Sequence, residues 1–189
     1  MRLLIMGPPG AGKGTQGALV AQLLGVPAIS TGEIFRSHVQ RQTALGQQVA
    51  QIMARGEYVP DEVTIQLVAD RLDQPDAAAG FLLDGFPRTV AQAEALDALL
   101  EERGTGLDVV LSLTADQEQL VARMLRRAQS EQRADDNADT IRRRFEVYQE
   151  QTADLLARYR QRDLLTEVDG LGEIAQVTDR IVAALNPAD

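Results

Sequence analysis

The stretch that decides the fold is Gly7-Pro8-Pro9-Gly10-Ala11-Gly12-Lys13-Gly14-Thr15, near the start of a chain of 189 residues. It follows a short apolar run, Arg2–Met6, that predicts a buried strand, and it precedes a stretch at 16–24 that predicts a helix. Glycines lack a Cβ atom, so backbone N–H groups in such a loop can close around an anion. The helix that follows presents its positive N-terminal end to the same anion. The order of strand, glycine-rich loop and helix therefore predicts a phosphate-binding loop.

Lys13 adds a full positive charge to this phosphate loop. The stretch from Gly7 to Lys13 fits the pattern G-x-x-x-x-G-K, in which the lysine reaches the outer phosphates of a nucleotide. The alternative is a glycine-rich surface turn. A coding bias towards arginine would explain why lysine is rare, yet the only lysine of the chain stands in this loop. Gly14 occupies the position where the general motif has Ser or Thr, and the hydroxyl comes one residue later, at Thr15. The pattern therefore indicates a hold on phosphate more clearly than a direct hold on Mg²⁺.

Composition and charge exclude several classes of protein. The net charge is −9, from 19 basic and 28 acidic residues, which disfavours a nucleic-acid backbone or an anionic membrane as the main partner. The absence of cysteine excludes disulfides and thiolate zinc sites. No signal peptide is visible, and no apolar run approaches the ~20 residues of a membrane span. We therefore expect a cytoplasmic protein.

Five apolar runs predict strands, and long amphipathic stretches separate most of them. The predicted strands are Arg2–Met6, Pro27–Ser30, Gly80–Asp84, Asp108–Leu113 and Leu164–Val168. This alternation predicts one α/β domain over residues 1–189, with a parallel five-stranded sheet and helices on both faces. Ligands of such sheets bind at the carboxyl ends of the strands. The phosphate loop, Ser30-Thr31-Gly32 and Asp84–Arg88 all fall there.

Two segments interrupt the alternation. Residues 30–59 are mostly helical in pattern and lie between the second strand and a helix that starts near Asp61, which predicts a small helical insertion. Ser30 or Thr31 can cap the first helix of this insertion. The polar stretch Ala128–Asp139 lies between two helices and predicts a short mobile flap.

Three motifs together resemble nucleoside monophosphate kinases, and adenylate kinases above all. These are Gly-x-Pro-Gly-x-Gly-Lys-Gly-Thr at 7–15, Ser-Thr-Gly-Glu-x-x-Arg at 30–36 and Asp-Gly-Phe-Pro-Arg at 84–88. The resemblance covers essentially the whole chain. It implies a P-loop NTPase-type fold in which residues 30–59 form the NMP-binding insertion and residues 127–138 a short lid without zinc.

The resemblance also implies how AMP is held. Arg88 follows a bend, and its planar fork of donors suits a phosphate. Gln92 lies one helical turn further, and its amide could read an adenine edge with a donor and an acceptor. The turn at 56–60 is expected to contact the base by backbone and packing, and a cis peptide is expected before Pro87. The implied AMP-binding residues are Thr31, Arg36, Glu57, Tyr58, Val59, Gly85, Phe86, Pro87, Arg88, Gln92, Arg133 and Arg144.

The ATP side is implied in the same way. Asp84 ends an apolar strand, and its carboxylate can hold Mg²⁺ through water. Gly172 resembles the backbone position near the ATP base. The implied ATP-binding residues are Gly10, Ala11, Gly12, Lys13, Gly14, Thr15, Arg127 and Gly172. The implied catalytic residues are Lys13, Arg88, Arg133 and Arg144, all of them cations that neutralise phosphate charge.

Helical phase separates the remaining arginines into two groups, at roughly 100° per residue. On the helix from Asp116, Arg127 lies nearest the edge of the apolar face. On the helix from Thr140, Arg144 lies within about 60° of the apolar stripe. These two are predicted to point into a cleft. The first apolar face is Leu120, Val121, Met124 and Leu125, and the second is Ile141, Phe145, Tyr148, Leu155 and Tyr159. The arginines predicted to be solvated are Arg126, Arg142 and Arg143.

The resemblance implies an ATP:AMP phosphotransferase that forms two ADP, with Mg²⁺ as cofactor and no zinc. Its partners would be ATP, AMP and ADP, and a monomer is the family default. The nearest alternative is a UMP/CMP kinase, which usually has Ala where Thr31 stands and Asn where Thr89 stands. A nucleotide-dependent switch is more distant, because reading guanine with Asn-Lys-x-Asp needs a second lysine. The sequence matches adenylate kinases at both discriminating positions.

Overall fold

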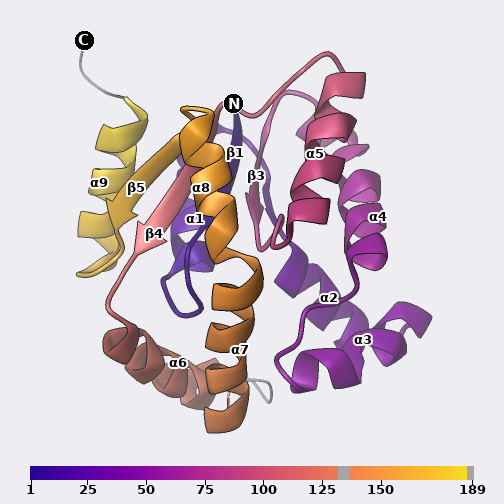
Figure 1. The fold of residues 1–189 in the computed structure, drawn as a ribbon, viewed down its shortest axis with the longest axis vertical. Helices are drawn as coiled ribbons and strands as arrows, with labels where there is room; N and C mark the ends of the chain where they lie inside the picture. The colour runs from indigo at the N-terminus through magenta and orange to yellow at the C-terminus, as the bar shows by residue number, and fades with distance from the viewer. Residues whose placement is uncertain (132–136, 187–189) are drawn as a thin grey trace.

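A computed structural model describes residues 1–131 and 137–186 of the chain, with no side chains described at 127–131. The strands of its sheet are β1 (Arg2–Met6), β2 (Ala28–Ser30), β3 (Phe81–Asp84), β4 (Val109–Thr114) and β5 (Leu165–Asp169). All of them pair in parallel, in the order β2-β3-β1-β4-β5 (Figure 1). The predicted five-stranded parallel sheet is confirmed, with small shifts at the strand ends.

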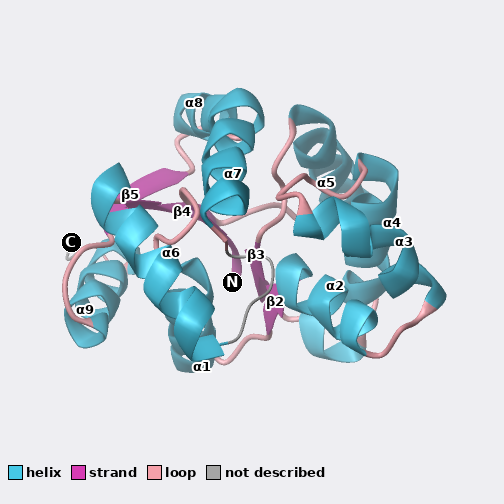
Figure 2. Ribbon diagram, turned by 90° about the horizontal axis from the view of Figure 1, so that it is seen from below, coloured by secondary structure: helices cyan, strands magenta, loops and turns pink. Residues whose placement is uncertain are grey.

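Helices cover both faces of this sheet, as the view along its lower edge shows (Figure 2). They are α1 (Lys13–Leu24), α2 (Thr31–Gln40), α3 (Ala44–Ala54), α4 (Asp61–Leu72), the 3-10 helix η1 (Pro75–Ala77), α5 (Val90–Glu102), α6 (Gln117–Glu131), α7 (Ala138–Gln151), α8 (Ala153–Gln161) and α9 (Ile174–Leu185). Helix α6 continues to Glu131, into the stretch expected to be a flap. Ala, Gln and Glu in that stretch favour helix, so the chain gives the helix no reason to end earlier.

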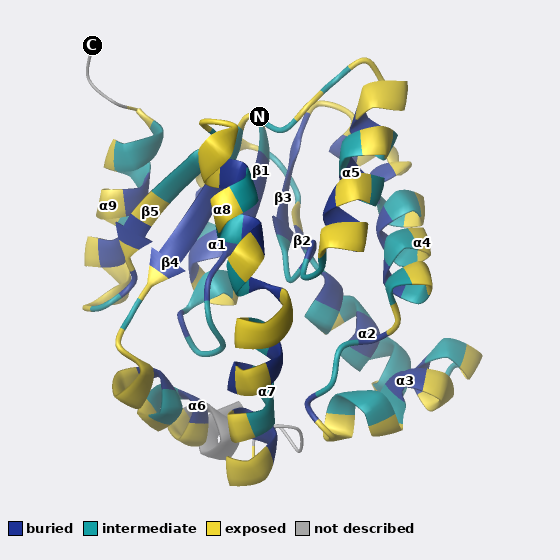
Figure 3. Cartoon of the chain, viewed as in Figure 1, coloured by how far each residue is buried: buried dark blue, intermediate teal, exposed yellow. Residues whose placement is uncertain are grey.

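The sheet is buried on both faces because successive side chains of a strand point to opposite sides. Leu3 and Ile5 of β1 belong to a core shared with α1, α6, α7 and α9. Leu4 and Met6 belong to a second core, shared with α4, α5 and α8. The buried residues accordingly follow the strands and the inner faces of the helices (Figure 3). Burial on both faces explains why the strands read as continuous apolar runs.

Helices α7 and α8 replace the single helix expected from Thr140. The chain breaks at Thr152, where φ is −109° and ψ is −30°. Phe145 packs in the core on the α1 side, whereas Leu155 and Tyr159 pack in the core on the α5 side. The interpretation of one continuous stripe is therefore wrong. An apolar pattern that runs through a break does not reveal that its two halves face different layers.

The predicted apolar face of α6 is also only partly right. Leu120 and Met124 are each 1% exposed, whereas Leu125 is 42% exposed. Leu125 lies on a smaller cavity of about 420 Å³ between α6 and α7, beside Val121 and Phe145. The buried surface of α6 is thus narrower than the sequence pattern suggests, because the helix contacts its neighbours along one edge.

Helices α2 and α3 form a small unit with its own core, built on Phe35, Val49 and Val59. They lie to one side of the carboxyl ends of the strands, and α6 and the start of α7 lie to the other side (Figure 1). None of the helices in the described part of the chain combines the length and the apolar character needed to cross a bilayer.

Candidate active site

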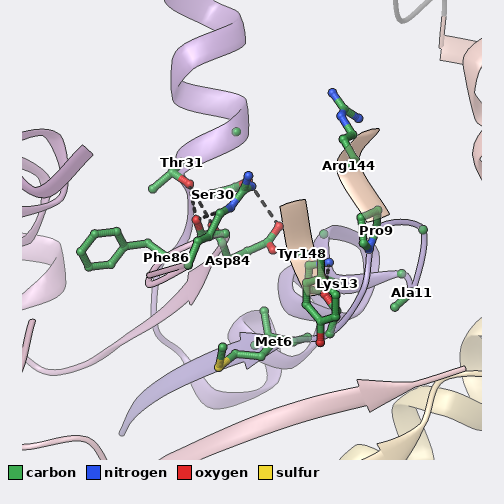
Figure 4. Close-up of a pocket in the computed structure, with 18 of the residues that line it drawn as sticks. Met6, Pro9, Ala11, Lys13, Ser30, Thr31, Asp84, Phe86, Arg144 and Tyr148 are labelled. Carbon is green, nitrogen blue, oxygen red and sulfur yellow. Dashed lines mark hydrogen bonds between the residues drawn. The ribbon is translucent and has the colours of Figure 1, made fainter. Parts of the chain in front are cut away.

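A cavity of about 790 Å³ opens at the carboxyl ends of the strands. It is lined by the phosphate loop, the ends of β2 and β3, the turn between α3 and α4, and the inner sides of α6 and α7. Figure 4 shows side chains from the phosphate loop (Pro9, Ala11 and Lys13) on one side of the view and those from the ends of β2 and β3 on the other. Segments far apart in the sequence therefore share one space.

The phosphate loop is held by the Lys13 side chain and by close packing against α6. Lys13 Nζ donates to the carbonyls of Gly7 and Pro8, at 2.8 and 2.9 Å. Gly10 has φ +80°, and a Cβ atom there would lie 2.9 Å from the carbonyl oxygen of Leu120 on α6. Only glycine satisfies both conditions. The loop thus lies close against α6, and the N-terminus of α1 lines the cavity as an anion site requires.

The end of β2 is joined to the end of β3 through two hydroxyls. Ser30 Oγ donates to Asp84 Oδ2 at 3.3 Å, and Thr31 Oγ1 donates to the carbonyl of Gly85 at 3.0 Å. Ser30 stands at the cap position of α2 without a side-chain capping bond, so the prediction that these hydroxyls cap the helix is wrong. Ser30 and Asp84 are direct register partners, and this proximity directs the hydroxyls across the sheet.

Two arginines lie along this wall of the cavity. Arg88 Nε donates to the carbonyl of Gly85 at 2.8 Å, and its backbone N–H donates to Gln92 Oε1 at 2.8 Å. The Arg36 guanidinium folds back over the first turn of α2, with Nη1 3.2 Å from where a Cβ atom on Gly32 would be. The Phe86–Pro87 peptide, directly before Arg88 in the turn after β3, is cis, as the resemblance implied.

The Gln92 amide is 1% exposed and has a fixed orientation. Its Oε1 accepts from the backbone N–H of Arg88, and its Nε2 donates to Asp61 Oδ1 at 2.7 Å. The other oxygen of Asp61 accepts from Thr89 Oγ1 at 2.9 Å. A carboxylate only accepts and an N–H only donates, so the amide cannot flip without losing both bonds. No motif in the sequence identifies Asp61 as the partner that sets this orientation.

The turn between α3 and α4 contacts α7 through side chains. Arg143 Nε donates to Glu57 Oε1 at 2.9 Å, with the two side chains 36% and 38% exposed. Hydrogen bonds to Glu57 and Glu146 raise the pKa of Arg143. Arg143 is therefore partly solvated and also forms an ion pair that the prediction missed, whereas Arg142 is 73% exposed as expected. Helical phase missed the ion pair because its partner comes from another segment.

Some polar cavity residues, among them Arg123, Tyr148 and Thr152, were not predicted as site residues from the sequence. Arg123 lines the cavity, and its Nη1 donates to the carbonyl of Gly170 at 3.0 Å. Its spacing of four residues from Arg127 is the signal that would have found it, because both then lie on one side of the helix. Tyr148 and Thr152 also line the cavity. Burial, with a smaller contribution from Tyr58, raises the pKa of Tyr148 to about 12, so its hydroxyl stays protonated at neutral pH.

The cavity brings together every predicted site residue whose side chain the structure describes. From the ATP set these are Gly10, Ala11, Gly12, Lys13, Gly14, Thr15 and Gly172. From the AMP set they are Thr31, Arg36, Glu57, Tyr58, Val59, Gly85, Phe86, Pro87, Arg88, Gln92 and Arg144. Asp84 lines the same cavity. The side chain of Arg127 and the whole of Arg133 lie outside the described residues.

The residues around Asp84 fit a hydrated Mg²⁺ ion better than a protein-built metal cage. Its Oδ2 lies 3.6 Å from where a Cβ atom on Gly14 would be, beside the first turn of α1. Within residues 1–131 and 137–186, no three His, Cys, Asp or Glu residues gather as a metal cluster. Mg²⁺ commonly keeps several waters and binds through one carboxylate and substrate phosphates. A single carboxylate next to a phosphate loop suits that mode.

The comparison with protein families decides which phosphate-binding fold this is. The family model described as adenylate kinase matches residues 5–164. The chain belongs to the adenylate kinase family. Among its curated relatives, the adenylate kinase of a Nocardioides species is 58% identical over 186 residues, 98% of this chain and 97% of the relative. That of Kocuria rhizophila is 56% identical over 184 residues, 97% of this chain and 98% of the relative. That of Thermobifida fusca is 51% identical over 185 residues, with 98% of each chain covered.

Membership of the adenylate kinase family confirms the resemblance drawn from the three motifs. It makes the chain a phosphotransferase of the nucleoside monophosphate kinase class. It also favours the adenylate kinase prediction over the UMP/CMP kinase alternative.

Proposed function

We propose that this adenylate kinase family member transfers the γ-phosphoryl group of MgATP to AMP, reversibly, and releases two ADP. One observation supports this above the others: the phosphate loop with Lys13 and the two arginines of the opposite wall, Arg36 and Arg88, line a single cavity. Two phosphate-binding groups that face one space suit a reaction in which one nucleotide passes a phosphoryl group directly to another.

The ATP phosphates bind in the loop Gly10–Thr15 in this proposal. Backbone N–H groups at the start of α1 and the Lys13 ammonium hold them, and Arg127 adds a further charge. The base lies towards Gly172, where Arg123 and Ile174 also line the cavity. Ile174 is 56% exposed, an apolar side chain at the rim that a purine base would cover.

AMP binds against the opposite wall. Its phosphate lies between Arg36 and Arg88, and its nucleoside against Thr31 and the turn at 57–59. Gln92 reads the base. An amide has two N–H donors and two acceptor lone pairs, and Asp61 and the Arg88 N–H use one of each. One donor and one acceptor remain in a fixed order, which is what the edge of adenine requires.

Phosphoryl transfer here needs no protein nucleophile. An oxygen of the AMP phosphate attacks the γ-phosphorus in line, that P–O bond forms while the bond to the β-phosphate oxygen breaks, and ADP leaves. Lys13, Arg88, Arg144 and the proposed Arg133 neutralise the charge that spreads over the transferring group. Asp84 would hold Mg²⁺ through water, and the ion when bound would add charge neutralisation on the phosphates.

The decisive experiment is a phosphoryl-transfer assay with MgATP against AMP, CMP, UMP and GMP. AMP is expected to have the highest kcat/KM by a wide margin, because a base whose edge does not match or does not reach Gln92 leaves the remaining donor and acceptor of this buried amide without partners. A comparable kcat/KM for CMP would overturn the proposal and favour a pyrimidine nucleotide kinase. Dependence of the rate on Mg²⁺ in the same assay tests the cofactor.

Several finer features remain proposals. They are the NMP-binding insertion at 30–59, the lid at 127–138, a monomeric state and a cytoplasmic location. Part of the lid lies outside the described residues. Contacts within α2 and α3 support the insertion as a unit, because its core is separate from the two cores of the sheet.

A further inference from the structure

Arg88 is fixed to the protein at three points by hydrogen bonds. Its backbone N–H donates to Gln92 Oε1 at 2.8 Å, its Nε donates to the Gly85 carbonyl at 2.8 Å, and its own carbonyl accepts from Thr152 Oγ1 at 2.9 Å. These bonds hold the backbone and one edge of the side chain. A further contact with the guanidinium group itself is needed to set the orientation of its plane.

Tyr58 lies against this guanidinium. The Arg88 Cζ atom lies over the Tyr58 ring, 4.7 Å from its centre, which is a cation–π contact. A contact of this kind can engage the flat face of a guanidinium and leave the N–H donors at its edge, where a phosphate oxygen binds. A ring in this position can therefore hold the plane without competing for the donors. The ring comes from the turn between α3 and α4, while Arg88 comes from the turn between β3 and α5.

A chain of two hydroxyls holds the ring in turn. Tyr58 Oη and Thr152 Oγ1 are 2.9 Å apart. A backbone carbonyl only accepts, so the one hydrogen of the Thr152 hydroxyl goes to the Arg88 carbonyl. Thr152 must then accept from Tyr58. The direction of the whole relay is thus fixed, from the Tyr58 hydroxyl through Thr152 to the backbone of Arg88.

Thr152 joins this relay to the fold. It is 4% exposed and stands at the break between α7 and α8. Its hydroxyl lies 64 residues from Arg88 along the chain. The same residue thus contacts the backbone of Arg88 and, through Tyr58, reaches its guanidinium. Tyr58 and Thr152 both line the cavity, but their hydroxyl hydrogens are used within this relay, so their polar contacts lead to Arg88.

We propose that Tyr58 and Thr152 are positioning residues for Arg88, which set the plane of its guanidinium for the monophosphate of AMP. The inference rests on the proposed function of Arg88 in holding that phosphate. It assigns to the side chain of Tyr58 a role separate from the backbone contact expected at 57–59. It makes the insertion a support for the phosphate-binding arginine as well as a wall for the nucleoside.

Two substitutions at Tyr58 separate the ring from the hydroxyl. Tyr58→Leu removes the cation–π contact and is expected to raise KM for AMP about tenfold, the scale of such a contact when partly desolvated. Tyr58→Phe keeps the ring and is expected to raise it about threefold, the scale of one neutral hydrogen bond. In both variants KM for ATP should stay within about twofold, because Tyr58 and Thr152 bond to each other and to Arg88, on the side of the cavity proposed for AMP. A purely structural role would lower stability and change both KM values alike.

Substitutions at Thr152 test the relay independently. Thr152→Val is expected to raise KM for AMP about fivefold, since it leaves the Tyr58 hydroxyl and the Arg88 carbonyl without their partner. Thr152→Ser keeps the hydroxyl and should restore KM to near the original value. The double variant Tyr58→Phe with Thr152→Val should be no worse than Thr152→Val alone, because both changes break one relay. Additive effects would overturn the relay.

Arg88→Lys distinguishes failure of this inference from failure of the proposed function. If Arg88→Lys weakens AMP binding strongly and Tyr58→Leu leaves KM for AMP unchanged, the positioning role is wrong and the phosphate site stands. If Arg88→Lys leaves AMP binding unchanged, both are wrong. Thermal denaturation of each variant accompanies the kinetics. A fall in Tm together with an unchanged ratio of the two KM values would identify Tyr58 as a packing residue and overturn the proposal.

Discussion

The two loops that lie on either side of the cavity hold their cations in different ways. Lys13 in the loop after β1 donates to Gly7 and Pro8, six and five residues away in the same loop. Arg88 in the turn after β3 relies on Tyr58 and Thr152, which come from other segments of the fold. These two hydrogen bonds of Lys13 stay within its loop, whereas Arg88 adds contacts from distant parts of the chain to its local bonds with Gly85 and Gln92.

This difference predicts which of the two substrates a substitution affects, and from what distance. A substitution in the phosphate loop should act on ATP directly and locally. A substitution far from the β3 turn should still reach AMP through the partners of Arg88 and Gln92. Substitutions in both regions therefore test this difference between the two loops.

The largest effect is expected from Lys13→Met, which removes the charge of the phosphate loop. Turnover should fall by at least ~10²-fold, the scale for losing one preorganised donor at the developing charge. Steady-state kcat with saturating MgATP and AMP measures it, and thermal denaturation checks the fold. A variant that folds normally and turns over at a near-native rate would remove Lys13 from the catalytic set.

Gly10→Ala should show that the backbone of this loop needs its glycine. With φ at +80° and Leu120 O 2.9 Å from the new Cβ atom, the loop must move away from α6. We expect a loss of about 1–3 kcal/mol in the free energy of unfolding and weaker ATP binding. Equilibrium denaturation and ATP titration measure the two.

Gly104→Ala is the matched control for this change. Gly104 has φ +64°, but no atom lies within 4 Å of a Cβ atom there. The left-handed conformation alone should cost about 1 kcal/mol, with unchanged ATP binding. Equal losses in both variants would mean that the close approach to α6 does not matter.

Asp61→Asn should act at a distance on the side of the cavity proposed for AMP. Asparagine keeps only one acceptor oxygen and loses the negative charge, so it accepts more weakly from Gln92 Nε2 than the carboxylate does. The amide of Gln92 is then held mainly by the N–H of Arg88 and is less firmly oriented towards the base. We expect KM for AMP to rise about fivefold and the preference for AMP over GMP to fall, as measured by kcat/KM for both.

Asp70→Asn is the control on the same helix. Asp70 accepts from Gln66 Nε2 at 2.7 Å on the exposed side of α4, away from the cavity. Loss of this carboxylate should leave kcat/KM for AMP and kcat/KM for GMP unchanged. If the two variants behave alike, the orientation of Gln92 does not depend on Asp61.

Tyr148→Phe should have the smallest effect, confined to alkaline pH. The unfolded chain loses a tyrosine proton near pH 10, whereas the folded protein keeps that of Tyr148 until its pKa of about 12. Between these values the folded state binds more protons, so the free energy of unfolding falls as pH rises. In the Tyr148→Phe variant the free energy of unfolding should fall less over this alkaline range. Its pH–rate profile between pH 6 and 9 should match that of the unsubstituted protein. A changed profile there would make Tyr148 part of the reaction.

The same contrast explains what the sequence could and could not predict. The phosphate loop was predictable because its motif, its strand and its helix are contiguous. The β3 turn was found as a motif, yet its supports were not. Tyr58, Asp61 and Thr152 belong to no common pattern, and their contacts join segments far apart along the chain. Ser30 illustrates the same limit, since its local pattern indicates a helix cap while its register partner Asp84 takes the hydroxyl.

The retention of a single lysine has a practical consequence at the bench. Lys13 Nζ is the one side-chain amine of the chain, so a reagent that acylates primary amines has two targets, the amino terminus and the phosphate loop. A second acyl group in the intact mass then reports on the loop, and bound nucleotide should delay its appearance. Amine coupling to a sensor surface would, by the same chemistry, consume the residue whose ligand the sensor was meant to detect.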